Sequence, residues 1–167
     1  MRRIRLFGSL RGAAIAAFGL ALQGCSSTGF GPTADPQPAV APAETPARYT
    51  AEEVVGRWGY AAYHKDADRA RTEAAARGQC RQPYVISKGP AGGVMMHLAD
   101  QGQPSELRLK GAPGGRSFIG PVGEAAGGAQ DREIISFDGR VMITRYVDPD
   151  AGNRYGNMVY VRCSPRA

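Results

Sequence analysis

The residues Gly56-Arg57-Trp58-Gly59-Tyr60-Ala61-Ala62-Tyr63 decide the fold. Trp58 and Tyr60 alternate along them with glycine and alanine, which is the two-residue period of a β-strand. We predict a first strand over Val54–Tyr63. A last strand is predicted over Tyr155–Cys163, where large side chains again alternate with small ones.

A single register joins these two strands. With Trp58 opposite Arg162 in an antiparallel pair, the guanidinium lies against the indole ring in a cation–π contact. The other side of the pair carries small residues, which leaves room for a helix that brings Cys80 towards Cys163. Because the first strand pairs with the last, the sheet closes. Two further pairs share the side of Trp58, namely Tyr60 with Tyr160 and Ala62 with Met158.

The intervening segment repeats short strand-like stretches separated by glycine and proline, which is typical of an antiparallel meander. Asp138-Gly139 is a hairpin signal. Between strands we expect a long loop over Pro121–Asp131 and a turn over Pro149–Asn153. The inner strands are predicted at Tyr84–Lys88, Val94–Ala99, Glu106–Lys110, Arg116–Gly120, Glu133–Phe137 and Arg140–Val147.

One helix is predicted over Asp66–Arg77, with Asp66 as its N-cap and a pair between Glu73 and Arg77. Its face towards the sheet is predicted to be the narrow stripe of Ala67, Ala70 and Ala74. The fold class is therefore mainly β: an eight-stranded antiparallel barrel or barrel-like sandwich with one short helix after the first strand. An α+β fold is the alternative.

The N-terminal residues 1–24 have the layout of a secretory signal, with a basic start before the apolar run Gly12–Leu22. This run has 11 residues, fewer than the ~20 that a spanning helix needs. Leu22-Gln23-Gly24-Cys25 then resembles the lipobox of bacterial lipoproteins. The resemblance implies lipidation of Cys25 and, because Ser26 is not aspartate, an anchor in the outer membrane of the cell envelope, facing the periplasm. A secreted protein with an unmodified cysteine is the alternative.

Residues 25–48 form a predicted tether rich in proline and alanine, without the apolar periodicity that a core requires. Residues 49–167 are long enough for one domain. Four of the 21 basic residues lie in the signal, whereas all 15 acidic residues follow it, so the mature chain carries 17 basic residues and a net charge of +2. This balance attracts polyanions weakly, and no nucleic-acid partner is predicted.

With Cys25 assigned to the lipid, Cys80 and Cys163 remain, and the oxidising periplasm favours a disulfide between them. There is no Cys-x-x-Cys motif to indicate a metal or redox site. Gly56 and Trp58 on the first strand, with Arg162 on the last, resemble the signature of lipocalins and related calycin barrels, an architecture that also occurs in bacterial metalloprotease inhibitors. That resemblance implies barrel closure by these three residues.

The sequence carries two histidines and no zinc-hydrolase, nucleophile-elbow or phosphate-loop motif, so we predict neither an enzyme nor a cofactor. A triad assembled only in space would make a hydrolase the least favoured alternative. Met95-Met96-His97 holds soft metal ligands, but neighbours on a strand face opposite ways, which favours core packing. Tyr60, Tyr146 and Tyr160 are the candidate surface for a ligand or a partner.

Three functions fit these observations. The first is a non-catalytic module that binds an envelope protein, for which protease inhibition is one version. The second is a carrier of a small apolar ligand inside the barrel, and the third is a structural accessory of envelope assembly.

Overall fold

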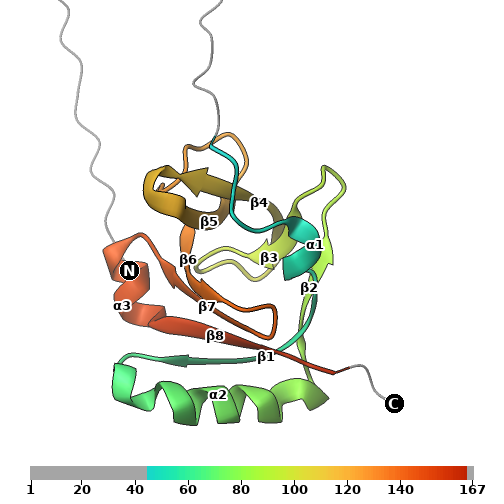
Figure 1. Cartoon of the computed structure of the whole chain (residues 1–167), viewed down its shortest axis with the longest axis vertical. Coiled ribbons are helices and arrows are strands. Elements are labelled where there is room, and N and C mark those ends of the chain that lie inside the picture. The colour runs from blue at the N-terminus through green and yellow to red at the C-terminus, as the bar shows by residue number, and fades with distance from the viewer. Residues whose placement is uncertain (1–44, 165–167) are drawn as a thin grey trace, which may run out of the picture. The chain divides into compact units, whose positions relative to one another are not determined.

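The computed structural model describes residues 45–164, and eight strands within them form a closed antiparallel barrel in sequential order (Figure 1). The predicted barrel is confirmed, and the sandwich and α+β alternatives are excluded. The strands are β1 (Gly56–Tyr63), β2 (Tyr84–Lys88), β3 (Val94–His97), β4 (Pro104–Ala112), β5 (Arg116–Pro121), β6 (Arg132–Phe137), β7 (Val141–Tyr146) and β8 (Asn157–Arg162). The helices of this part are α1 (Ala51–Val54), α2 (Arg69–Gly78) and α3 (Pro149–Tyr155), with 3-10 turns at Asp66–Asp68, Gln79–Arg81 and Pro113–Gly115.

Strands β1 and β8 close the barrel in the predicted register. Trp58 pairs with Arg162, and the same register sets Tyr60 against Tyr160 and Ala62 against Met158. The guanidinium carbon of Arg162 lies 4.1 Å from the centre of the Trp58 ring. A shift by one residue would turn the indole out of the barrel, so its burial holds this register in place.

Helix α1 covers the end of the barrel that contains Trp58. The predicted first strand is wrong at its start, because Val54 belongs to this helix rather than to β1. Thr50 and Glu53 form a capping box in which each side chain accepts from the other's backbone N–H. Gly56 then turns the chain into β1 at φ +154°, which favours glycine. The indole of Trp58 donates to the Val54 carbonyl at 3.0 Å, which fixes the helix over the ring.

Helix α2 lies outside the barrel, alongside β1 and β8 (Figure 1). The predicted contact face is wrong: the alanine stripe is exposed, and Thr72 and Ala76 are buried instead. The position of Cys80 explains why the helix presents this face to the barrel. Thr72, Ala76 and Cys80 are spaced by four and so lie on one side, and the disulfide from Cys80 to Cys163 holds that side against the end of β8. A Cβ on Gly59 would lie 1.9 Å from the Ala76 carbonyl oxygen, so only glycine admits the helix so closely.

Two details of the predicted helix are also wrong. Asp66 opens a 3-10 turn and does not cap α2, whose N-cap is Asp68 without a side-chain hydrogen bond. Glu73 pairs with Arg69, one turn earlier, rather than with Arg77.

Helix α3 replaces the turn predicted over Pro149–Asn153 and the beginning of the last strand. The Asp148 carboxylate accepts from the Ala151 N–H at 2.8 Å, and Pro149 occupies the first turn. Gly156 ends the helix at φ +67°, so β8 begins only at Asn157. These start and stop signals are present in the sequence.

The N-terminal approach to the barrel begins before the predicted domain boundary at residue 49. Thr45 accepts from the Gly111 N–H at 3.1 Å, and the Arg48 N–H donates to the Ser117 hydroxyl at 3.0 Å. The predicted signal peptide, Cys25 and the remaining tether lie outside the described residues. Within residues 45–164, no helix is both long and apolar enough to cross a membrane.

Candidate functional site

The interior of the barrel is filled at one end and hollow at the other. Trp58, Ile86 and Leu107 are at most 1% exposed and fill the end beneath α1. The opposite end holds a pocket of about 400 Å³ that opens to solvent. It is lined by Tyr60, Tyr84, His97, Leu98, Asp100, Gln101, Gly102, Arg132, Tyr146, Tyr155, Met158 and Tyr160.

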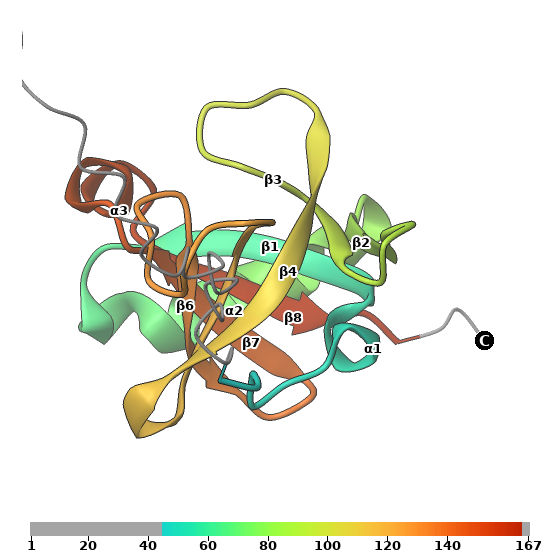
Figure 2. The same cartoon turned by 90° about the horizontal axis from the view of Figure 1, so that it is seen from above.

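The pocket wall draws on six of the eight strands, all except β4 and β5, and on two segments between strands. Part of it comes from the β3–β4 connection, which stands out from the barrel as a long loop in Figure 2. Tyr155 of α3 supplies the facing part of the rim. The site is therefore built on paired strands, and its rim comes from the β3–β4 connection and from α3.

All three tyrosines singled out from the sequence lie in this pocket. The ring centres of Tyr60 and Tyr160 are 5.1 Å apart, and those of Tyr60 and Tyr84 are 5.9 Å apart. Tyr146 packs against Tyr155 with 5.5 Å between ring centres. Tilted contacts of this kind hold aromatic walls in place. Trp58, which could have walled a cavity, instead belongs to the filled end.

Arg132 of β6 lies beneath the tyrosines and is only 2% exposed. Its guanidinium donates to the hydroxyls of Tyr146 at 3.0 Å and Tyr160 at 3.3 Å, and to the His97 carbonyl. Burial opposes its charge, but the oxygens of Tyr160, Tyr146 and Tyr84 outweigh burial and raise the pKa of Arg132. The floor of the pocket is therefore a permanent cation.

Burial acts in the opposite sense on the phenols. It raises the pKa of Tyr146 to about 12, although the charge of Arg132 works against that rise. Burial likewise raises the pKa of Tyr60 and of Tyr84. These hydroxyls stay protonated at neutral pH and can donate hydrogen bonds to a ligand.

The rim carries one carboxylate, that of Asp100. Its oxygens accept from Arg154, both at 2.7 Å, and one also accepts from the Tyr155 hydroxyl at 2.6 Å. These hydrogen bonds lower the pKa of Asp100, that from Tyr155 most. The backbone of Asp100 has φ +60°, a conformation that most residues avoid. The hydrogen bonds to Arg154 and Tyr155 help to hold Asp100 in this conformation.

Sequence reasoning missed Arg132, Tyr84, His97 and Met158 as parts of the site. Strand alternation could have identified Arg132. Ile134 points into the core, and Arg132, two residues earlier on the same strand, must lie on the same face. For His97, Nδ1 lies 3.2 Å from the Tyr84 hydroxyl, whereas Met96 is fully buried in the core. Met96 therefore belongs to the core, whereas His97 is partly buried and lines the pocket.

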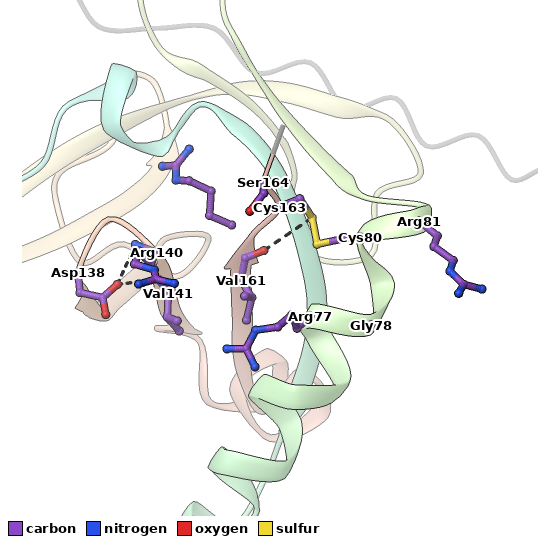
Figure 3. Close-up of a pocket in the computed structure, with 11 residues that line it drawn as sticks. Arg77, Gly78, Cys80, Arg81, Asp138, Arg140, Val141, Val161, Cys163 and Ser164 are labelled. Carbon is purple, nitrogen blue, oxygen red and sulfur yellow. Dashed lines mark hydrogen bonds between the residues drawn. A yellow bond between two sulfur atoms is a disulfide. The ribbon is translucent and has the colours of Figure 1, made fainter. Parts of the chain in front are cut away.

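A second hollow, a groove of about 870 Å³, lies on the outer wall beside the disulfide. Figure 3 shows Cys80 bonded to Cys163 between the end of α2 and the β6–β7 turn. The predicted disulfide is confirmed. The residues lining the groove include Arg77, Arg81, Arg140 and Arg162, with Asp138 as the acidic member.

The charge of Asp138 is already engaged in the turn. Its carboxylate accepts from the backbone N–H groups of Val141 at 2.6 Å and Arg140 at 2.8 Å, which lowers its pKa. The lining of the groove is thus predominantly basic.

The fold and the pocket together define a closed eight-stranded barrel with a polar-floored pocket at one open end. No protein-family model, curated protein or solved structure matches the chain. The lipocalin and lipobox resemblances stay predictions, and function has to be argued from the pocket itself.

Proposed function

We propose that the protein is a lipid-anchored binding protein of the cell envelope that takes up a small aromatic molecule in the tyrosine-lined pocket of its barrel. The anchor rests on the lipobox-like residues at Cys25. The observation that supports ligand binding is the hollow end of the barrel, because a structural barrel of this size could be filled throughout with side chains.

The composition of the wall supports an aromatic ligand. Tyr60, Tyr84, Tyr146, Tyr155 and Tyr160 together with His97 present rings, whereas Leu98 and Met158 are the aliphatic members of the lining. An aromatic ligand gains about 0.5–1.5 kcal/mol for each well-placed ring contact beyond its buried area. At about 400 Å³, the pocket lies within the range of small-molecule sites.

Leu98→Trp is expected to weaken binding of a neutral aromatic probe at least about tenfold, because the larger side chain fills the pocket. The probe is N-phenyl-1-naphthylamine, whose fluorescence rises in an apolar site. Titration of the wild-type protein should saturate at one probe per chain. Val85→Trp is the matched control, since Val85 is 58% exposed and does not line the pocket. Equal binding by both variants would place the probe elsewhere.

The basic groove supports a second candidate function, docking of an acidic segment of an envelope protein. None of its four arginines takes part in the ion pairs among residues 45–164. Arg162 donates to backbone carbonyls, which leaves Arg77, Arg81 and Arg140 as the candidates for docking. Planar guanidinium groups suit carboxylates, which they bind through two parallel hydrogen bonds.

Arg77→Gln with Arg140→Gln is expected to weaken binding of a fluorescent hexaglutamate peptide by about fivefold at low salt. The measurement is fluorescence anisotropy. The control, Arg69→Gln with Arg71→Gln, removes the same charge from α2 at residues that pair with Glu73 and Asp68. If both double variants bind alike, the attraction comes from overall charge and the groove is not a docking site.

A further inference from the structure

Arg132 is a buried charge without an acidic partner. None of the ion pairs among residues 45–164 includes it. Its hydrogen bonds go to two phenol oxygens and one backbone carbonyl, and its Nε has no partner among the described residues. Charged groups that are buried in proteins are normally paired, so a missing anion is the physical expectation at this place.

The acids next to Arg132 in the sequence cannot supply that anion. Asp131 binds Lys110 at 2.8 Å, and Glu133 binds Arg116 at 2.7 and 2.8 Å. Because neighbours on a strand face opposite ways, both acids lie on the outside of the barrel while Arg132 points inward. The rim carboxylate of Asp100 is engaged by Arg154 and Tyr155.

The tyrosine hydroxyls extend the positive floor of the pocket towards its opening. Tyr146 and Tyr160 accept hydrogen bonds from the guanidinium, which leaves the O–H of Tyr146 as a donor. The O–H of Tyr160 donates to the Met158 sulfur at 3.9 Å, a weak acceptor that a ligand carboxylate can replace. A hydroxyl that accepts from a cation donates more strongly, because linked hydrogen bonds polarise one another. The site therefore offers a positive charge and phenol donors in one place, surrounded by aromatic rings.

We propose that the ligand is an aromatic carboxylate, whose ring packs between the tyrosines and whose carboxylate is stabilised by Arg132 and by the hydroxyls of Tyr146 and Tyr160. This inference rests on the proposed ligand-binding function and adds the charge and class of the ligand. The carboxylate supplies the missing counter-charge, and the rings exclude water from it, which strengthens the attraction.

The test compares 2-naphthoate with 2-naphthamide, a neutral analogue of nearly the same shape, by isothermal titration calorimetry at neutral pH. The wild-type protein is expected to bind 2-naphthoate at least about tenfold more tightly, since a hydrogen bond to a charged group adds that much or more. Arg132→Gln should remove the preference while 2-naphthamide binding changes less than about threefold. Arg132→Lys should keep part of the preference.

Tyr146→Phe provides a second test in case the Arg132 variants do not fold. It removes one hydroxyl from a side chain that is 7% exposed, keeps the charge and should reduce 2-naphthoate binding by about threefold to tenfold without affecting 2-naphthamide. Equal binding of the two compounds by the wild-type protein would overturn the inference and leave the proposed function in place. Failure of 2-naphthoate, 2-naphthamide and the neutral naphthylamine probe to bind at all would overturn both.

Discussion

Replacing Cys80 and Cys163 together by alanine is expected to lower the free energy of unfolding by about 4–5 kcal/mol. The disulfide joins residues separated by 83 positions, so it closes a loop that contains most of the barrel. Without it, the unfolded chain gains conformational entropy that the folded chain does not share. Urea unfolding followed by circular dichroism measures the change. Wild-type protein treated with a thiol reductant should lose the same stability.

Ligand binding serves as the control for this variant. The disulfide lies in the groove on the outer wall, whereas the pocket opens at the end of the barrel. Below its unfolding midpoint, the double variant should therefore bind N-phenyl-1-naphthylamine as the wild type does. A loss of stability below about 1 kcal/mol would contradict the prediction and show that the unfolded chain keeps residual contacts that restrain it without the disulfide.

The sequence specified closure because one pairing satisfies several constraints at once. Trp58 must be buried, Arg162 must contact it, and a slip by one residue would reverse the inside and outside of both strands. Alternation along β1 and β8 therefore suffices to predict their register. The local signals at α1 and α3 were equally readable, in the capping box of Thr50 and Glu53 and in the N-cap Asp148.

The face of α2 could not be read from its own residues. Alanines occur all around this helix, so small side chains do not distinguish the buried face. The disulfide selects that face by holding Cys80 to β8, and Thr72 and Ala76 follow at a spacing of four. This choice depends on a contact between residues far apart in the chain, which local periodicity does not encode.

The pocket illustrates the same limit. Strand alternation places Arg132 inside the barrel, but its lack of a counter-ion depends on where Asp131 finds its partner. In the sequence, Asp131 and Arg132 are adjacent and resemble a pair of opposite charges. In the barrel they face opposite sides, and the cation that Asp131 binds comes from β4, 21 positions away.

Asp131 carries the second large prediction. Its carboxylate is 0% exposed and accepts from Lys110 at 2.8 Å, from the Gly127 N–H at 2.8 Å and from the Gly128 N–H at 3.3 Å. The loop predicted before β6 is thus fastened to β4 through one side chain. A Cβ on Gly120 would lie 1.6 Å from the carboxylate, so the surrounding backbone leaves no room for rearrangement.

Asp131→Asn is expected to lower the free energy of unfolding by about 3–5 kcal/mol. The amide keeps the shape but loses the charge, and its NH₂ group must face either the Lys110 ammonium or the backbone N–H groups, all of which are donors. Urea unfolding measures the effect. Glu133→Gln is the matched control, because the Arg116–Glu133 pair has side chains 56% and 27% exposed and should contribute at most about 1 kcal/mol.

The same variant tests whether the Lys110–Asp131 ion pair outside the barrel influences ligand binding in the pocket. Because Asp131 faces away from Arg132, Asp131→Asn should leave the preference for 2-naphthoate over 2-naphthamide unchanged at temperatures where the variant is folded. A stronger preference in the variant would mean that Asp131 partly neutralises Arg132 across the strand. The premise that the buried guanidinium lacks a counter-charge within the protein would then be wrong.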